Sequence, residues 1–310
     1  MSTLFQQQID ALIENIEKVI IGKRDVVELL LVGLIARGHV LLEDVPGVGK
    51  TMLARSLARS LRATFGRVQC TPDLLPSDIV GASVYNQKTA AFEFRPGPIF
   101  ANIFLVDEIN RTTPRTQSGL LECMQEFNVT VDGITHPLPG PFFVLATENP
   151  IEFRGTYPLP EAQLDRFLLK LEMGYPSKLG EEGIMMRYLK QAPIESLEPV
   201  TDVPSVLAWQ EGVANVHVEK EIMTYIMNVI SATREHQDIQ LGASPRGTLA
   251  LMQAARALAL IEGRDYVIPM DVKRLAPSVL RHRLAMRPRA AARGVTAKSV
   301  LEQLLSTLST

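Results

Sequence analysis

The chain alternates short continuous apolar runs with longer segments in which apolar residues return every three or four positions. Continuous apolar runs are typical of strands buried on both faces of a parallel sheet, and the periodic segments indicate crossover helices. A first helix is expected around Ser2 to Val19, and Arg115–Glu126 is another. The runs that we predict as strands are His39–Glu43, Thr64–Cys70, Ile103–Asp107, Phe142–Thr147 and Phe167–Met173. This part of the chain is expected to fold as α/β.

Two segments inside this part have the pattern of β-hairpins. Ser83–Tyr85 and Phe92–Phe94 flank the polar connection Asn86–Ala90, and Val129–Thr135 carries an Asp-Gly pair between β-branched residues. Surface insertions are well tolerated, but loops also often carry function. From the residues alone, both a decorative and a functional interpretation stay open.

The pattern changes near Gly174-Tyr175-Pro176, where we expect the sheet domain to end. Lys178–Ala192 is predicted as a helix, Pro193–Pro204 as a connection that contains prolines, and the rest as helices with no convincing strand. The alanine and leucine periodicity of Thr248–Ile261 supports this interpretation. The predicted domains are a core over residues 1–175, a linker helix and connection over 176–204, and a small helical lid over 205–310.

The composition limits the possible partners. The chain has 310 residues, and 32 basic against 34 acidic side chains give a net charge of −2. No global field therefore favours nucleic acid or an anionic membrane. No segment reaches the roughly 18 apolar residues of a membrane span, and the first residues do not resemble a leader peptide. We expect a cytoplasmic protein without membrane insertion, in which Cys70 and Cys123 are buried reduced thiols.

The most informative segment is HVLLEDVPGVGKTM, from His39 to Met52, where an apolar strand turns into a helix. Its glycines let backbone N–H groups point inward, and the helix N-terminus adds a positive field, which together suit a phosphate. Lys50 is expected to reach the β- and γ-phosphates of ATP and Thr51 to ligate Mg²⁺. An ordinary glycine-rich turn is the alternative. The residues predicted to contact the nucleotide here are Asp44, Val45, Pro46, Gly47, Val48, Gly49, Lys50, Thr51 and Met52.

One position departs from the pattern G-x-x-x-x-G-K-[ST], because Asp44 stands where the first glycine is expected. Asp tolerates left-handed backbone angles better than most residues. We therefore expect the turn to remain possible.

Polar side chains follow two further predicted strands. Asp107 and Glu108 end the apolar run from Ile103, where Asp107 would hold the water shell of Mg²⁺ and Glu108 would orient and deprotonate the attacking water. Asn149 follows the next strand, and it would contact the γ-phosphate or the water. An Asn-Pro turn is the alternative for Asn149.

Two arginines are candidates for contacts to phosphate. Arg166 precedes the fifth predicted strand, where it could neutralise a phosphate bound by a neighbouring subunit, or simply pair with Asp165 or Glu161. Arg246 begins a predicted lid helix after Ser244-Pro245, so a helix-capping role is its alternative. A third basic feature is the segment from Val272 to Leu301, which has no acidic residue. It is either a solvated or subunit-facing surface or a docking patch for an acidic partner.

Taken together, these motifs resemble the AAA+ ATPases and, within them, the MoxR-type ATPases. The resemblance extends from about Val19 to Arg283. It is carried by EDVPGVGKT, TPDLLPSDIVG, EFRPGPIFANIFLVDEINR, ENP, GTYPLPEAQLDRF and SPR. It implies a P-loop NTPase fold, with a three-layer αβα core around a parallel five-stranded sheet and a small all-α C-terminal lid domain.

The resemblance also implies a role for each candidate residue. Lys50 and Thr51 belong to Walker A, Asp107 and Glu108 to Walker B, Asn149 to sensor 1, Arg166 to the arginine finger and Arg246 to sensor 2. The resemblance further implies that the arginine finger acts across a subunit boundary, while for sensor 2 action within one chain or across the boundary stays open. The two hairpins correspond to the helix-2 insert and the pre-sensor-1 hairpin, which magnesium-chelatase ATPase subunits and MCM helicases share.

Family similarity implies a homo-oligomeric, hexameric ring that hydrolyses ATP with Mg²⁺ and remodels or matures client proteins together with a von Willebrand factor A-domain partner. A helicase-type nucleic-acid motor and a magnesium-chelatase-like metal-insertion motor are the alternatives. The hairpin tips disfavour nucleic acid, because one is Asp132-Gly133 and the other carries Lys88 alone as a cation. A small-molecule kinase would need an acceptor pocket, for which the sequence offers no obvious residues.

Overall fold

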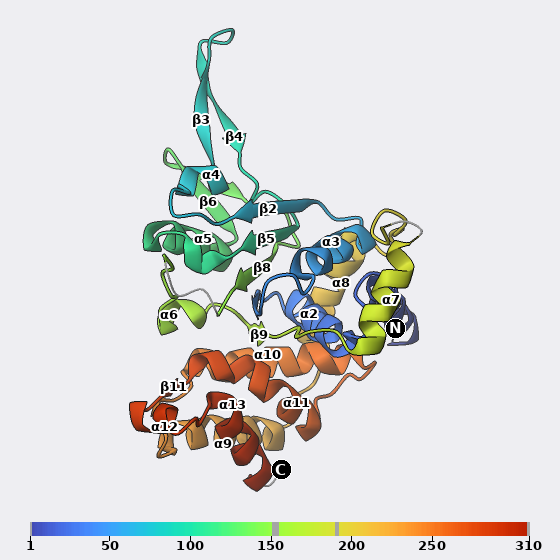
Figure 1. The fold of residues 1–310 in the computed structure, drawn as a ribbon, viewed down its shortest axis with the longest axis vertical. Helices are drawn as coiled ribbons and strands as arrows, with labels where there is room; N and C mark the ends of the chain where they lie inside the picture. The colour runs from blue at the N-terminus through green and yellow to red at the C-terminus, as the bar shows by residue number, and fades with distance from the viewer. Residues whose placement is uncertain (1, 151–154, 190–191, 309–310) are drawn as a thin grey trace.

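The computed structural model describes residues 2–150, 155–189 and 192–308, and its centre is a parallel five-stranded sheet in the order β2-β5-β8-β1-β9 (Figure 1). Each pairing in this sheet is parallel. The strands are β1 (Val40–Glu43), β2 (Phe65–Gln69), β5 (Ile103–Asp107), β8 (Phe143–Glu148) and β9 (Leu169–Leu171). All five predicted strands are confirmed, and their ends differ by at most two residues from the prediction.

Helices cover both faces of the sheet. Successive residues of a strand point to opposite faces, so an apolar strand presents apolar side chains to the helices on both sides. Val40 and Leu42 of β1 face one apolar cluster and Leu41 faces the other, and all three are fully buried. The first cluster contains α1 (Ser2–Glu17), α2 (Arg24–Ile35) and α3 (Lys50–Ser60), and the second contains α4 (Pro76–Val80) and α5 (Pro114–Glu126). The expected three-layer αβα core is therefore confirmed.

Both predicted hairpins are present. β3 (Gly81–Asn86) pairs with β4 (Ala91–Pro96), and β6 (Asn128–Val131) pairs with β7 (Ile134–Pro137), each antiparallel. In Figure 1 the β3–β4 hairpin projects from the end of the molecule that lies opposite the lid. The two hairpins meet where the ring of Phe94 stacks on His136 at 4.1 Å between centroids.

The second half of the chain is largely helical. The linker helix α7 (Lys178–Tyr188) is followed by α8 (Val203–Gly212), α9 (Lys220–Glu235), α10 (Pro245–Ile261), α11 (Pro269–Leu280), α12 (Pro288–Ala292) and α13 (Ala297–Thr307). Short 3-10 helices cover Ile109–Arg111, Val213–Asn215 and Arg281–Arg283, and α6 (Glu161–Leu164) is a single turn. The end of the predicted helix Lys178–Ala192 includes residues 190 and 191, which lie outside the described residues. In the described part of the chain, no helix is long and apolar enough to cross a membrane.

One prediction about this half was wrong. The structure contains two short antiparallel strands, β10 (Ile239–Leu241) and β11 (Ala285–Met286), where we expected helices alone. Strands of two or three residues are too short to display the alternation by which a strand is recognised. In addition, α8 begins at Val203, so the predicted connection ends slightly earlier than Pro204.

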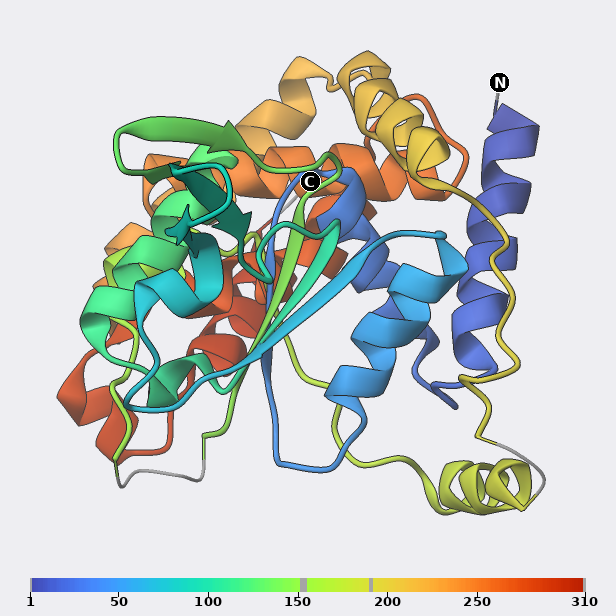
Figure 2. The same cartoon turned by 90° about the horizontal axis from the view of Figure 1, so that it is seen from above.

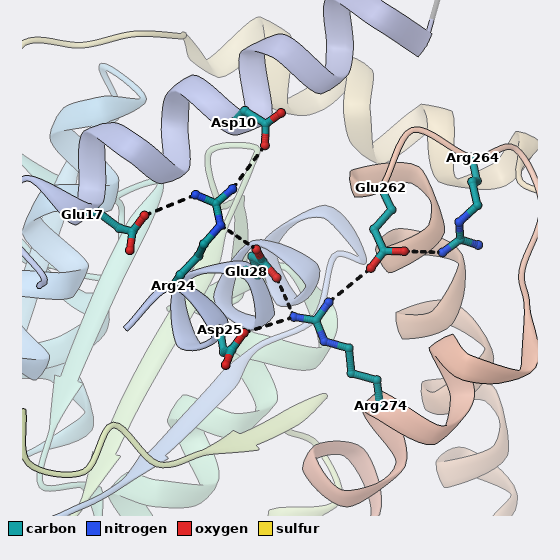
Figure 3. A network of polar contacts seen from close by, with 8 residues as sticks. All are labelled: Asp10, Glu17, Arg24, Asp25, Glu28, Glu262, Arg264 and Arg274. Carbon is teal, nitrogen blue, oxygen red and sulfur yellow. Dashed lines mark hydrogen bonds and ion pairs between the residues drawn. The ribbon is translucent and has the colours of Figure 1, made fainter. Parts of the chain in front are cut away.

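The lid lies against the core through α2. Apolar residues of α2, α10 and α11 belong to one buried cluster, and α10 lies beside α2. Ion pairs follow the same junction (Figure 3), where Arg274 of α11 contacts Glu28 of α2 at 2.5 Å and Glu262 at 3.2 Å. Arg24 of α2 continues the network to Asp10 in α1. Core and lid of one chain are thus joined by a shared apolar interface with a polar rim.

Candidate nucleotide site

The loop between β1 and α3 has the backbone expected of a phosphate-binding turn. Gly47 and Gly49 have φ angles of +85° and +95°, and Gly49 is the N-cap of α3. A Cβ atom at Gly47 would meet no heavy atom within 4 Å. Glycine is therefore required here by the left-handed backbone and not by a lack of space. The first turn of α3 contains no acidic residue, so the positive field of the helix N-terminus is not cancelled locally.

The structure brings most of the predicted nucleotide-site residues to one cavity of about 330 Å³. Its lining comes from the loop, the start of α3 and the carboxyl ends of β2, β5 and β8. The lining residues are Pro46, Gly47, Gly49, Lys50, Thr51, Met52, Gln69, Asp107, Glu108 and Asn149. Asp44, Val45 and Val48 of the predicted set do not line it; Val48 packs against the apolar cluster instead.

Lys50 is half-buried, and its Nζ donates to the backbone carbonyl of Asp44 at 2.7 Å. Burial lowers the pKa of Lys50, while the nearby carboxylates of Asp44, Asp107 and Glu108 oppose this shift. Asn149, which directly follows β8, is 4% exposed. The cavity therefore combines one cation with two acidic side chains and two side-chain amides, Gln69 and Asn149.

Asp107, the last residue of β5, and Glu108, which follows it, both contact a threonine that we did not predict as a site residue. The hydroxyl of Thr147 in β8 donates to Asp107 Oδ1 at 2.7 Å, and the hydroxyl oxygen of Thr147 accepts the backbone N–H of Glu108 at 2.8 Å. Glu108 has a φ of +57°, which is uncommon for a residue with a side chain. Thr147 is fully buried, and it holds the carboxylate of Asp107 and the backbone of Glu108 at the end of β5.

Polar residues of β2 and of the turn after β5 contact the same carboxylates. Arg67 donates to Asp107 Oδ2 at 2.8 Å. Gln69 and Arg111 donate to Glu108 Oε2 at 2.9 and 3.0 Å. The signal that could have revealed Thr147 and Gln69 is a polar residue at the carboxyl end of an otherwise apolar strand, beside the phosphate loop.

The turn is formed with Asp44 at the position of the first glycine, and it does not use the tolerance of Asp for left-handed angles. Asp44 does not take a left-handed conformation; its side chain is buried and accepts hydrogen bonds. Asp44 Oδ1 accepts from the N–H of Val45 at 2.9 Å, and Oδ2 accepts from Met173 and Gly174 at 2.6 and 2.5 Å. The turn tolerates Asp because its carboxylate satisfies amides of a neighbouring segment.

The two candidate arginines lie together but away from the phosphate loop. Arg166 and Arg246 line a separate cavity of about 250 Å³, together with Arg37 and Gln125. Neither arginine lines the cavity of Lys50. Arg246 is exposed, its Nη2 donates to Gln125 Oε1 at 3.3 Å, and it does not cap α10, whose N-cap is Ser244.

The alternative pairing of Arg166 with Asp165 or Glu161 is not what the structure contains. Asp165 Oδ1 accepts from Arg283 Nε at 2.7 Å, and Oδ2 accepts from Ser244 Oγ at 3.1 Å. Among the described residues, Arg166 forms no ion pair. Asp165 thus pairs with a lid residue, Arg283, and within the described ranges no carboxylate forms an ion pair with Arg166.

Much of the basic segment from Val272 to Leu301 is used inside the chain. Arg274, Arg281, Arg283 and Arg293 form ion pairs with Glu28, Glu172, Asp165 and Asp238, respectively. Arg287 donates to the carbonyl of Ile239 at 3.2 Å. These internal contacts leave less free charge for an acidic partner than the sequence suggests.

The comparisons with known proteins agree with this geometry. Residues 39–169 match the ATPase family associated with various cellular activities (AAA), and residues 231–304 match the AAA lid domain. The chain is 55% identical to the uncharacterised protein YeaC of Bacillus subtilis, over 95% of this chain and 92% of YeaC. It is 44% identical to the chaperone MoxR1 of Mycobacterium tuberculosis, over 95% of this chain and 80% of MoxR1.

A solved structure shares the whole architecture. The crystal structure of a candidate ATPase from Cytophaga hutchinsonii is 38% identical and superposes with a TM-score of 0.93, covering 99% of this chain and 96% of the other. Because 38% of the residues are identical over almost the full length of both chains, the two proteins are similar in sequence as well as in fold. The phosphate loop, the paired carboxylates, the helical lid and these relatives together establish that the chain belongs to the MoxR-type AAA+ ATPases.

Proposed function

We propose that the chain hydrolyses ATP with Mg²⁺ at sites shared between neighbouring subunits of a homo-oligomeric ring, hexameric by family resemblance. The observation that carries this proposal is the separation of the two cavities. Lys50 and the carboxylates line one of them, and Arg166 and Arg246 line the other. An arginine that is to neutralise a γ-phosphate must reach it, and in one chain these arginines do not border the phosphate loop.

The residues of the phosphate-loop cavity fit a magnesium nucleotide. Hard oxygen ligands suit Mg²⁺, and the hydroxyl of Thr51 and the carboxylate of Asp107 border the same cavity as Lys50. Thr51 would bind the metal directly and Asp107 through water, which would neutralise charge on the phosphates. Lys50 would hold the β- and γ-phosphates, beside the loop amides from Val45 to Met52.

The remaining residues would act on the attacking water and on the transferred phosphoryl group. Glu108 would orient the water and accept its proton, and Asn149 would position the water or the γ-phosphate. Arg166 of the neighbouring subunit would stabilise the negative charge that develops as the γ-phosphoryl group leaves, with Arg246 beside it.

We infer that the ring remodels or matures client proteins or complexes, with a von Willebrand factor A-domain protein as partner. The chaperone name of MoxR1 supports this direction. The helicase alternative is weaker because the tips of the two hairpins, residues 86–90 and 132–133, carry Lys88 as their single cation. Metal insertion remains the more distant alternative. A cytoplasmic location is part of this proposal.

The test is Mg²⁺-dependent ATP turnover per chain, measured as the protein concentration rises, with the oligomeric state sized at each concentration. Shared sites predict that specific activity rises to a plateau as the ring assembles. Full activity in a fraction that sizing identifies as monomer would contradict the shared site. Turnover that needs DNA and is accompanied by tight, salt-sensitive DNA binding would instead support the helicase alternative.

The assignment of Glu108 and Lys50 is tested separately. Glu108→Gln is expected to retain ATP binding and lose turnover, because the amide cannot accept the proton. Lys50→Ala is expected to lose binding, because the phosphates lose their cation. Equilibrium binding of a fluorescent ATP analogue separates the two effects, and normal hydrolysis by Glu108→Gln would exclude Glu108 as the base.

A further inference from the structure

A buried carboxylate ties the phosphate loop to the segment through which the chain leaves the sheet. This exit segment, residues 173–175, follows β9 and precedes α7. Asp44 accepts hydrogen bonds from the N–H groups of Met173 and Gly174 at 2.6 and 2.5 Å and is only 9% exposed. Hydrogen bonds to an ionised acceptor are shorter and stronger than neutral ones. The position of the exit segment is therefore set directly by the loop.

The exit segment is also held from its other side. Lys23, just before α2, donates its Nζ to the carbonyl of Tyr175 at 2.8 Å. Gly174 has a φ of +62°, a conformation that residues with side chains rarely adopt. The segment thus has a defined bend between two anchors, one of which belongs to the phosphate loop.

Helix α7 begins directly beyond this bend and lies at the outside of the molecule. In Figure 2 the yellow-green helix stands apart from the sheet and from the lid helices. Leu179 and Leu189 are 80% and 78% exposed, and Arg187 ties the helix back through the carbonyls of Glu17 and Lys18. A small change in the exit segment would therefore change the position of a helix that few packing contacts restrain.

Asp44 also contacts a residue of the proposed ATP site, Lys50, through its backbone carbonyl. Its carbonyl accepts from Lys50 Nζ at 2.7 Å, while its carboxylate holds the exit segment. Because the ammonium group of a lysine has three N–H donors, Lys50 can bind the β- and γ-phosphates while it contacts this carbonyl, so a bound nucleotide is linked to Asp44 through Lys50. The loop residue that Lys50 contacts is thus the same residue that positions Met173 and Gly174.

We propose that Asp44 is a positioning residue that couples the occupancy of the phosphate loop to the exit segment and, through it, to α7. This inference rests on the proposed ATP site. It gives a physical reason for Asp at a position where the general loop pattern has glycine: glycine would permit the turn but would leave two N–H groups without their acceptor.

The experiment measures amide hydrogen exchange of the peptide that covers residues 171–178, with and without Mg²⁺-ATP, in a Glu108→Gln background that prevents turnover. With Asp44 intact, ATP is expected to slow exchange of this peptide by about tenfold, because a filled loop fixes the carboxylate. Asp44→Gly is expected to exchange about tenfold faster and to lose the response to ATP while still binding it. Asp44→Asn, which keeps an acceptor, retains part of the response.

The matched control is Asp202→Gly, which removes an exposed carboxylate that accepts the N–H of Ser205 at 3.0 Å at the start of α8. In this control, the amide exchange of residues 171–178 and its response to ATP should be the same as in the parent protein. The coupling would be overturned if ATP slowed exchange equally in Asp44→Gly. It would also be overturned if ATP were shown to bind to the parent protein without slowing exchange of residues 171–178. A parent protein that does not bind ATP would overturn the proposed function and this inference together.

Discussion

At the scale of single residues, the site depends on side chains that connect strands far apart in the sequence. Thr147 holds the carboxylate of Asp107 and the backbone of Glu108 from a neighbouring strand, and Asp44 supports a segment about 130 positions further along the chain. The sequence predicted Lys50, Thr51, Asp107, Glu108 and Asn149 as site residues because each belongs to a local pattern, and all five line one cavity. It could not reveal the partner of Asp44, because that partner is a pair of backbone amides.

Thr147→Val tests whether the buried hydroxyl positions the carboxylates. The substitution keeps the shape but removes the donor to Asp107 and the acceptor for the Glu108 N–H. We expect ATP turnover to fall about 10- to 100-fold, because small displacements of catalytic groups are costly. Nucleotide binding should change much less. Unaltered turnover, with the exposed Thr224→Val as control, would show that Thr147 is only a packing residue.

The buried histidine His39 makes the stability depend on pH. Its Nδ1 accepts the N–H of Val144, its Nε2 contacts the carbonyl of Met124, and burial lowers its pKa to about 4. Between pH 4 and 6.5 the native state binds fewer protons than the unfolded chain. The free energy of unfolding therefore rises with pH across this window, by roughly 3 kcal/mol from His39, and levels off above it.

Urea unfolding from pH 4.5 to 7.5 measures this dependence. His282 is also buried with a lowered pKa, so it adds a contribution of the same sign. The variant His39→Gln should show a shallower rise than the wild-type protein over the same range. Identical pH profiles for the two proteins would contradict the assignment to His39.

At the scale of elements, the apolar runs predicted the parallel strands because such strands are buried on both faces. Val40, Leu41 and Leu42 are all inaccessible to solvent, so nearly every position of β1 must be apolar. The strands β10 and β11 were missed because they are short and lie among helices. The junction between lid and core also could not be predicted from the sequence, because it depends on contacts between residues far apart in the chain, such as Arg274 with Glu28.

Two arginines of this junction are expected to differ in their effect on stability. The side chain of Arg283 is 2% exposed and contacts Asp165 and the carbonyl of Phe167, whereas that of Arg274 is 32% exposed. Arg283→Met should lower the free energy of unfolding by about 3–5 kcal/mol, because it leaves buried acceptors without a donor. Arg274→Met should cost only about 0.5–1 kcal/mol, because its ion pairs are partly solvated.

Denaturant unfolding at low and high salt distinguishes the two cases. Salt should reduce the effect of Arg274→Met and leave that of Arg283→Met almost unchanged, because screening acts on exposed pairs. Equal losses in the two variants, with the same dependence on salt, would contradict the distinction between a buried and a partly solvated ion pair.

At the scale of the whole molecule, core and lid share one apolar cluster while the two halves of the proposed catalytic site do not share a cavity. The family resemblance predicted an arginine that acts between subunits, and the separation of Arg166 from Lys50 supports this. The proposed client and partner could not be identified from the sequence, because surfaces that bind other proteins have no fixed spacing of residues.

The most direct test of the shared site is to mix two inactive variants. Lys50→Ala cannot hold the nucleotide, and Arg166→Ala cannot supply the arginine. In a randomly mixed ring at equal amounts, about one quarter of the interfaces pair an intact phosphate loop with an intact Arg166. ATP turnover should therefore reappear on mixing, and it should stay absent when the Lys50→Ala chain is mixed with the double variant. No recovery in rings shown to contain both chains would contradict the account.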